Sequence, residues 1–163
     1  MVSRTDVRDR GPGDHAWVAE TLSSVWGTGL VVSRGRAHQA DELPGLVAER
    51  DEKPVGLLTY HIASGELEVV TIHAFEPRSG VGSVLLEAAL RRARDEHCRR
   101  LWLVTTNDNA AAIAFYESFG LRLVAVHRGA VAASRRIKPE IPRVGPSGIA
   151  IEDELEFELD LRE

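Results

Sequence analysis

The sequence predicts an α+β domain with one mixed, mostly antiparallel central sheet flanked by helices. Residues 45–75 contain three β-rich runs separated by tight turns, which is typical of an antiparallel meander. From Gly80 onward the hydrophobic period becomes that of a helix, and a strand and a second helix follow. Residues 154–161 alternate between acidic and apolar side chains, as a half-buried strand does. This order of elements predicts one sheet with helices packed on it.

Length and composition predict a single domain over residues 1–163. A chain of 163 residues can bury one core, and 44% of its residues are hydrophobic. No apolar run approaches the roughly 20 residues that cross a bilayer, and residues 1–10 lack a secretion signal, so we expect a cytoplasmic protein without a membrane partner. The formal net charge of −5 disfavours general nucleic-acid binding, which needs a clustered basic surface.

Cysteine and histidine usage predicts neither a disulfide nor a metal centre. Cys98 is the only cysteine, which favours a small buried thiol over a thiolate cluster or a nucleophile. The histidines show no metal-ligand spacing. We therefore expect no metal.

The N-terminal part is expected to hold one helix and the meander. Asp14 is a candidate cap for a helix over residues 15–26, whose apolar residues recur with a helical period and which Gly27 would end. Residues 30–33 form a candidate strand, and residues 38–44 are interpreted as a connection. The meander strands are predicted at residues 45–50, 55–62 and 66–75.

The C-terminal part is expected to alternate helices and strands. Helices are predicted at residues 80–97 and 109–119, the second ended by Gly120, and strands at residues 101–105, 121–128 and 154–161. Residues 132–149 are rich in proline and glycine and are interpreted as irregular. A long connection often carries function, so this segment is a candidate lid or dimer contact.

Residues 78–83, Arg-Ser-Gly-Val-Gly-Ser, join the meander to the first of these helices. The first amides of a helix have no internal partner and lie at the positive end of its dipole, so this turn is a candidate anion site. Gly80 and Gly82 leave the backbone open to a phosphate, Arg78 adds charge and Ser83 adds a hydroxyl donor. A tight connection without a ligand explains the glycines equally well. The spacing does not fit a dinucleotide fingerprint, because position 85 is leucine.

The block at residues 107–121 resembles the GNAT superfamily of N-acetyltransferases. The family's second motif, N-x-x-A-x-x-F-Y-E-x-x-G-F, is matched by Asn109, Ala112, Phe115, Tyr116, Glu117 and Gly120, while Leu121 replaces the commoner phenylalanine. The family's first motif, R/Q-x-x-G-x-G after a strand, is matched at Gly80 and Gly82. Pro77 stands where arginine or glutamine is expected, and Arg78 follows one place later. The resemblance covers roughly residues 46–126.

This resemblance implies an acetyl-CoA-dependent N-acetyltransferase whose central strands, 66–74 and 101–105, splay apart to admit pantetheine. The amides of residues 78–83 would hold the pyrophosphate, backbone groups of Ile72 and Ala74 would pair with pantetheine, and Tyr116 would lie beside the sulfur. The residues implied in coenzyme binding are Ile72, His73, Ala74, Arg78, Ser79, Gly80, Val81, Gly82, Ser83, Asn109, Ala112 and Tyr116. Acetyl-CoA would be the co-substrate.

Acetyl transfer to an amine involves two proton movements. A lysine-like amine, with a pKa of about 10.4, is almost entirely protonated at pH 7, so a base assists its attack. The leaving thiolate resembles that of cysteine, with a pKa of about 8.5, so an acid assists its departure. Tyr116 is the candidate acid. Glu68 is the candidate base, acting through a water; Glu66 shares its facing by strand alternation, and His73, of opposite parity, is the alternative.

The acceptor is expected to be a primary amine of a small molecule or a peptide. Its pocket would be built by the first helix, residues 36–44 and the segment after Leu121. Four acidic residues of the last strand either attract a cationic amine or form a solvated face of the sheet: Glu154, Glu156, Glu158 and Asp160. A homodimer is compatible with the sequence. Two other functions remain open at this point, a non-catalytic acyl-CoA-binding regulatory module and a nucleotide-phosphate binder outside the GNAT superfamily.

Overall fold

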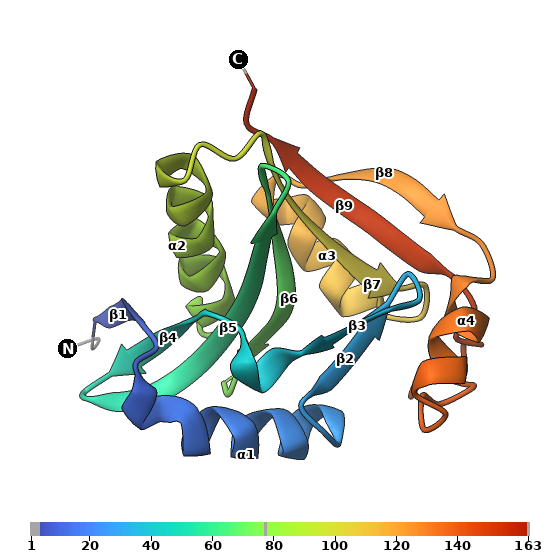
Figure 1. Cartoon of the computed structure of the whole chain (residues 1–163), viewed down its shortest axis with the longest axis horizontal. Helices are drawn as coiled ribbons and strands as arrows, with labels where there is room; N and C mark the ends of the chain where they lie inside the picture. Colours follow the sequence, from blue (N-terminus) through green and yellow to red (C-terminus); the bar gives the residue numbers. More distant parts are fainter. Residues whose placement is uncertain (1–3, 77, 163) are drawn as a thin grey trace. The chain divides into compact units, whose positions relative to one another are not determined.

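The computed structural model describes residues 4–76 and 78–162 and contains two compact units. Unit 1 is formed by residues 4–31, 39–101 and 161–162, and unit 2 by Val32–His38 and Trp102–Asp160. Figure 1 labels the elements along the chain. They are β1 (Thr5–Asp9), α1 (His15–Trp26), β2 (Leu30–Ser33), β3 (Arg36–Gln39), β4 (Gly45–Arg50), β5 (Lys53–Ala63), β6 (Glu66–Ala74), α2 (Val81–Asp95), β7 (Arg100–Thr106), α3 (Ala110–Phe119), β8 (Arg122–His127), α4 (Ala130–Ile137) and β9 (Glu154–Asp160).

The sheet of unit 1 has the order β1-β4-β5-β6, and each of these neighbouring pairs is antiparallel. Helix α1 covers one face of this sheet (Figure 1). Its apolar stripe places Val18 and Leu22 in a fully buried cluster with Val47 and Leu57 of the sheet. Because Val47 and Leu57 are cross-strand partners, their side chains share the face that α1 covers.

Helix α2 packs on the opposite face of the same sheet, and Gly56 makes the close contact there. A β-carbon built on Gly56 would lie only 2.6 Å from Cγ1 of Val81 and 3.0 Å from Cδ1 of Leu85. Both residues are buried on α2. The first turn of α2 therefore rests directly on the backbone of β5.

A β-bulge interrupts the pairing of β5 with β6. Thr59 pairs with Thr71, but Tyr60 pairs with Val69, so Val70 is an extra residue on β6. The bulge reverses the facing of every β6 side chain that follows it, relative to simple alternation. Cross-strand pairing consequently places Glu68, Thr71 and His73 on one face, with the odd-numbered residues of β5.

In unit 2 the strand order is β7-β9-β8, and β8 and β9 are antiparallel. Phe157 of β9 is 1% exposed and lies beside Tyr116 of α3, with 6.2 Å between their ring centroids. Helix α3 ends at Gly120, whose φ of 116° is the left-handed conformation that favours glycine. Short turns lead from β8 into α4 (Figure 1).

The α+β class is confirmed, and most predicted elements lie within one or two residues of their expected bounds. Three elements were missed, which are β1, β3 and α4. The strands β1 and β3 are short and polar, TDVRD and RAHQ, and lack a hydrophobic alternation. The expected irregularity of residues 132–149 is wrong at its start, because α4 extends to Ile137, and Val131 and Ser134 are buried on one side of that helix. Pro77, where the first motif departs from the family, lies outside the described residues.

A further correction concerns β9, for which a solvated acidic face was one of the two alternatives. Glu154 and Glu156 are buried, at 2% and 6% exposure. Alternation assigns side chains to opposite faces of a strand correctly, but it does not reveal whether a second face is also covered. Among the described residues, no helix is long and apolar enough to cross a membrane.

Candidate functional site

The turn that precedes α2 leaves the first amides of the helix without an intrahelical partner. Gly80 caps the helix with a φ of 82°, and Arg78 is also left-handed, with a φ of 61°. The first hydrogen bond of α2 runs from the Val84 N–H to the Gly80 carbonyl, so the N–H groups of Val81, Gly82 and Ser83 precede it. The first turn of α2 carries no acidic residue. Its positive end can therefore receive an anion.

Two side chains in this turn differ in their availability. The hydroxyl of Ser79 donates a hydrogen bond to the Glu76 carbonyl at 2.6 Å, so that proton is already in use. Arg78 is exposed. A β-carbon at Gly80 would meet nothing within 4 Å, so glycine serves the backbone conformation there and the adjoining space is open.

The C-terminal half of β6 presents backbone groups away from β5. The Phe75 N–H donates to the Val55 carbonyl at 3.0 Å, which makes residues 73 and 75 the ones that bond to β5. In an antiparallel ladder the intervening residues direct their N–H and C=O groups to the other edge of the strand. Ile72 and Ala74 are these residues, and this is the orientation that pairing with an extended ligand would need.

His73 belongs to a row of aromatic contacts on the α1 side of the sheet. Its ring centroid lies 5.1 Å from that of Phe75 and 6.0 Å from that of Trp26. Phe75 in turn contacts Trp17 edge-on at 5.9 Å. Burial lowers the pKa of His73, which favours the neutral imidazole.

The bulge changes the relation between the two candidate bases. By simple alternation His73 was expected on the face opposite Glu68, and this is wrong, because Val70 shifts the register between them. Glu68 is 5% exposed and pairs across the strands with His61. Between Glu68 and His73, the buried hydroxyls of Thr59 and Thr71 hydrogen bond at 2.6 Å. A polar row thus crosses the otherwise apolar α1 side of the sheet.

Glu66 is held in a different environment from Glu68. Its two carboxylate oxygens accept hydrogen bonds from the Arg99 and Arg100 guanidinium groups. Arg99 also donates to the Ser64 carbonyl at 2.6 Å, at the turn that precedes β6. Glu66 therefore stabilises the start of the strand.

Tyr116 lies on α3 in unit 2, buried between aromatic rings. It is 8% exposed, and its ring lies 5.5 Å from that of Phe115 and 6.2 Å from that of Phe157. Burial raises its pKa to about 12, so the phenol stays protonated at neutral pH. Within residues 4–76 and 78–162 its hydroxyl has no hydrogen-bond partner. Every side-chain polar atom there that is fully shielded from solvent does have a partner, so the Tyr116 hydroxyl is not fully shielded. The hydroxyl is therefore reachable and available as a donor.

Asn109 and Ala112 form the start of α3. The Asn109 side-chain oxygen accepts a hydrogen bond from the Ala112 N–H at 3.3 Å, which is an N-terminal helix cap. The Asn109 side-chain amide nitrogen is not used in this cap. The motif residue therefore stabilises α3 and keeps a donor for other contacts.

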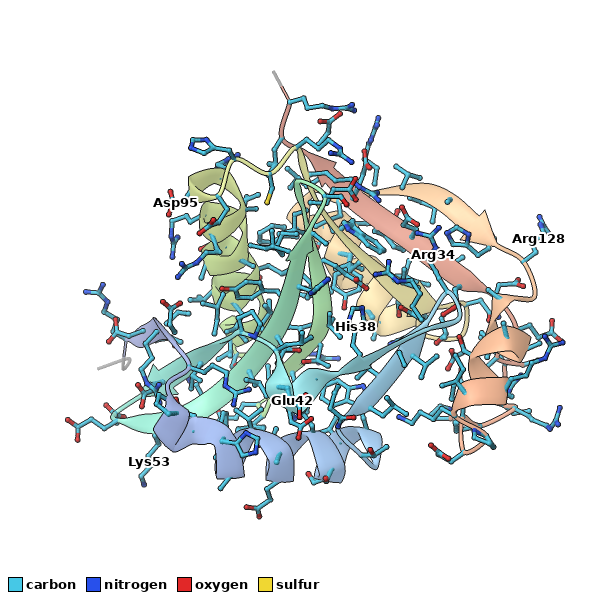
Figure 2. The ribbon with its side chains drawn as sticks, in the orientation of Figure 1. Arg34, His38, Glu42, Lys53, Asp95 and Arg128 are labelled. Carbon is cyan, nitrogen blue, oxygen red and sulfur yellow. The ribbon has the colours of Figure 1, made fainter. Side chains whose placement is uncertain are left out.

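A cluster that the sequence did not predict surrounds Glu154 and Glu156 in unit 2. The backbone N–H of Arg34 donates to both Glu154 oxygens, at 2.8 and 3.2 Å, and Nη1 of Arg34 lies 3.1 Å from Oε1 of Glu156. Nε2 of His127 lies 3.0 Å from the same Glu156 oxygen. Figure 2 labels Arg34 at the tip of the β2–β3 hairpin. No sequence pattern indicated this pairing, because Arg34 and Glu154 are 120 residues apart.

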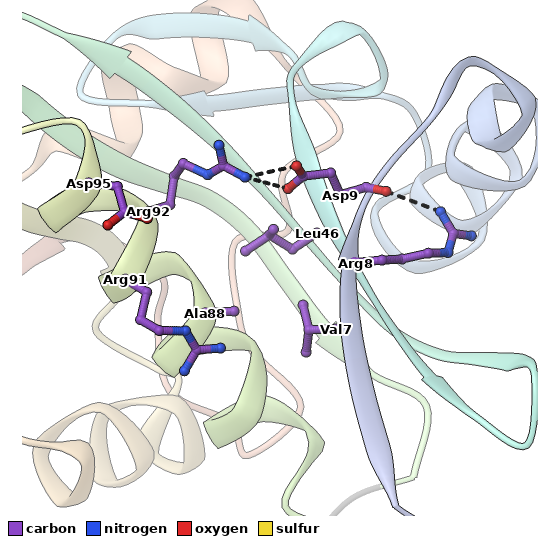
Figure 3. Close-up of a pocket in the computed structure, with 8 residues that line it drawn as sticks. All are labelled: Val7, Arg8, Asp9, Leu46, Ala88, Arg91, Arg92 and Asp95. Carbon is purple, nitrogen blue, oxygen red and sulfur yellow. Dashed lines mark hydrogen bonds and ion pairs between the residues drawn. The ribbon is translucent and has the colours of Figure 1, made fainter.

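A hollow of about 270 Å³ lies between β1, β4 and the C-terminal half of α2 (Figure 3). Its basic residues include Arg8 and Arg92, and both are already paired. Arg92 binds both oxygens of Asp9 at 2.7 and 2.8 Å, and Arg8 binds Asp14 and Glu49. The predicted phosphate turn is at the other end of α2, so this hollow does not contain it.

In the part of the chain that the structure describes, no group of three or more histidine, cysteine, aspartate or glutamate side chains that could hold a metal ion is found. Burial raises the pKa of Cys98, which therefore stays a protonated thiol at neutral pH.

Three comparisons place these features among known proteins. Residues 13–121, which include parts of both units, match the model of the acetyltransferase (GNAT) family. The chain is 38% identical over 141 residues to the uncharacterized protein YdhI of Bacillus subtilis (strain 168), covering 86% of this chain and 88% of that protein.

Two solved structures share its fold at low sequence identity. An IAA acetyltransferase from Bacillus cereus ATCC 14579 matches with a TM-score of 0.70 and 16% identity, over 97% of this chain and all of the other, 100%. A GNAT family acetyltransferase from Elizabethkingia anophelis, solved with acetyl-CoA bound, matches with a TM-score of 0.70 and 16% identity, over 96% and 98% of the two chains. The fold is thus that of GNAT acetyltransferases.

Proposed function

Since this chain belongs to the acetyltransferase (GNAT) family, we propose that it transfers an acetyl group from acetyl-CoA to a primary amine. The observation that carries the proposal is the outward-facing backbone of Ile72 and Ala74, which leads directly into the open first turn of α2. An extended ligand that ends in a diphosphate has the matching chemistry. The acceptor is proposed to be a small molecule or a peptide, and residues 1–163 are proposed to act as one domain.

Coenzyme binding is proposed to use backbone groups more than side chains. The N–H groups of residues 78–83 would hold the pyrophosphate, with Arg78 adding charge, and Ile72 and Ala74 would pair with pantetheine. The unused amide nitrogen of Asn109 is the proposed donor from α3. His73 and Ala112 are proposed as further contacts. No metal is required for this chemistry.

Tyr116 is proposed to donate a hydrogen bond, and finally its proton, to the leaving thiolate. Its pKa of about 12 keeps the proton in place until the thiolate forms. Full transfer to a free thiolate with a pKa of about 8.5 would be uphill by about 5 kcal/mol. We therefore expect the phenol to act first as a hydrogen-bond donor to the developing negative charge.

Glu68 is proposed to accept the proton of the attacking amine through a water. Its burial on the same face as His73 and the Thr59–Thr71 pair supports a polar path in an otherwise apolar region. The attacking amine must lose a proton during the reaction, and an ionised carboxylate can accept it. Glu66 is less suited, since Arg99 and Arg100 already hold both of its oxygens.

The competing function is an acyl-CoA-binding regulatory module without turnover. A screen of acetyl-CoA-dependent thiol release over polyamines, aminoglycosides, amino acids and N-terminal peptides separates the two. Thiol release with an amine supports the enzyme, whereas acetyl-CoA binding without release by any amine supports the module. Thermal-shift measurements with acetyl-CoA, ATP and NAD test the coenzyme itself, and stabilisation by ATP or NAD alone would reject both functions.

Replacing Tyr116 by phenylalanine tests the proposed mechanism. Y116F should lower the maximal rate about tenfold or more, because the hydrogen bond to the thiolate is lost, while acetyl-CoA affinity stays close to that of the wild type. Tyr60, the other tyrosine of the chain, is similarly buried on β5 and gives the matched control. Y60F should keep wild-type turnover. Equal rates in Y116F and the wild type would remove Tyr116 from the mechanism.

A further inference from the structure

The tip of the β2–β3 hairpin, residues Val32–His38, has an unusual turn. Arg34 and Gly35 form its centre with φ values of 52° and 69°. Two consecutive positive φ values are those of a type I′ turn, in which the first central position usually holds asparagine, aspartate or glycine. Arginine is unfavourable in this conformation. The strained backbone at Arg34 must therefore be offset by contacts elsewhere in the protein.

The side chain of Arg34 makes its contacts within unit 2. The chain passes from unit 1 to unit 2 between Val31 and Val32 and returns after His38. In unit 2 the guanidinium of Arg34 contacts Glu156 at 3.1 Å and lies 5.8 Å above the ring of Trp102. A cation above an indole face is attracted to it.

The two carboxylates beneath the hairpin tip depend on this contact. Burying charged carboxylates is strongly unfavourable unless they are paired and hydrogen bonded. Burial raises the pKa of Glu154, and the hydrogen bond from the Arg34 N–H opposes that rise. Glu156 is bound by Arg34 from the hairpin and by His127 from β8. The hairpin tip therefore supplies both a backbone donor and a cation to the buried pair.

The hairpin tip also packs on the helix that follows β8. A β-carbon at Gly35 would lie 4.0 Å from Cβ of Ala133, which is van der Waals contact. The hydroxyl of Ser134 on the same helix lies 3.5 Å from Glu154. Within unit 2 the tip thus joins the regions after Leu121, from which the acceptor pocket is expected. Because the Arg34 side chain remains 39% exposed, it can dissociate without unfolding a core.

We propose that Arg34 is a positioning residue for the acceptor, because it holds the hairpin tip on β9 and the closed tip forms one wall of the acceptor site. This inference rests on the proposed acetyl transfer. Acetyl-CoA binding is expected to be independent of it, since the partners of Arg34 in unit 2, which are Glu154, Glu156 and Trp102, are not among the residues proposed to bind the coenzyme.

Hydrogen-exchange mass spectrometry on the ligand-free protein tests the contact itself. R34A should increase exchange at residues 32–38, whereas R34K, which keeps the cation, should restore much of the protection. R94A removes an exposed arginine near the end of α2, outside every proposed site, and should leave exchange at residues 32–38 unchanged. Equal exchange in R34A and the wild type would overturn the hairpin contact, whatever the enzyme does.

Steady-state kinetics with the amine of highest turnover in the screen tests the role. In R34A the KM for that amine should rise roughly tenfold, because the hairpin tip that forms the wall of the acceptor site would no longer be held in position, while the KM for acetyl-CoA changes little. R34K should recover most of this loss, and E156Q combined with R34A should add little to either single change. Equal increases in the two KM values, or R94A behaving like R34A, would overturn the positioning role. Absence of turnover by the wild type with every amine would reject the proposed function and, with it, the acceptor role.

Discussion

Two strands of this protein, β6 and β9, carry paired glutamates two residues apart, and the structure treats the pairs differently. On β6, Glu66 is bound by two arginines at the strand start, and Glu68 is buried beside a row of threonines and histidines. On β9, both Glu154 and Glu156 are buried and bound by one hairpin residue. The comparison shows that the role of a strand carboxylate depends on what covers the strand.

The sharpest test of this comparison is the replacement of Glu68. E68Q should lower kcat/KM about a hundredfold and remove the acidic limb of its pH profile, since the amide cannot accept the proton. E66Q, two residues away on the same face, should keep the wild-type profile. Steady-state kinetics across roughly pH 5 to 9 measures the pH profiles of both variants. An unaltered profile in E68Q would reject Glu68 as the base.

The next effect concerns stability and Glu154. Burial raises the pKa of Glu154 in the folded protein. Glu154 therefore stabilises the fold at pH values below the ordinary pKa of glutamate, and this contribution is lost as the pH rises through the raised pKa. The amide that replaces the carboxyl group in E154Q does not titrate. E154Q should therefore gain stability relative to the wild type as the pH rises, on the order of 1 kcal/mol.

Urea denaturation of both proteins at acidic and neutral pH measures this difference. The exposed Glu152, two residues earlier, provides the control, and E152Q should follow the wild type at every pH. A constant difference between E154Q and the wild type would show that the burial of Glu154 has no effect on its titration.

Glu66 should matter for stability and not for turnover. Its ion pairs with Arg99 and Arg100 join the start of β6 to the start of β7 within unit 1 and are partly exposed. E66Q should lower the free energy of unfolding by about 1 kcal/mol or less. Loss of activity in E66Q comparable to that in E68Q would break the contrast between the two positions.

The smallest expected effect is at Asp14, whose shift has the opposite sign to that of Glu154. Hydrogen bonds from Arg8 and from the Gly11 N–H lower its pKa from 3.8 to about 2. Its contribution to stability is present above pH 3.8 and is lost as the pH falls toward about 2. D14N should cost less than about 1 kcal/mol at pH 7, because the pair with Arg8 is partly exposed and screened by salt. Urea denaturation at low and high salt checks this.

The sequence predicted the elements with strong periodicity and the two motifs, because these are local patterns. The helix after Gly80 and the cap at Gly120 follow from glycine conformations and apolar spacing, and both were found where expected. The bulge at Val70 could not be predicted, because it depends on how β6 pairs with β5 and not on its own composition. The Arg34 contact was missed for the same reason. It forms between segments far apart in the chain, and arginine is an atypical residue for its turn.

The missing side chain of Gly56 has a consequence for the anion-binding turn. A methyl group there would overlap Val81, the first residue of α2, whose amide is one of the proposed phosphate donors. Helix α2 can lie this close to the sheet because position 56, 25 residues upstream of Val81, carries only a hydrogen atom. The position of the N-terminus of α2 therefore depends on Gly56. An alanine at position 56 would therefore shift the amides that are proposed to bind a diphosphate, although Gly56 is not itself one of the proposed binding residues.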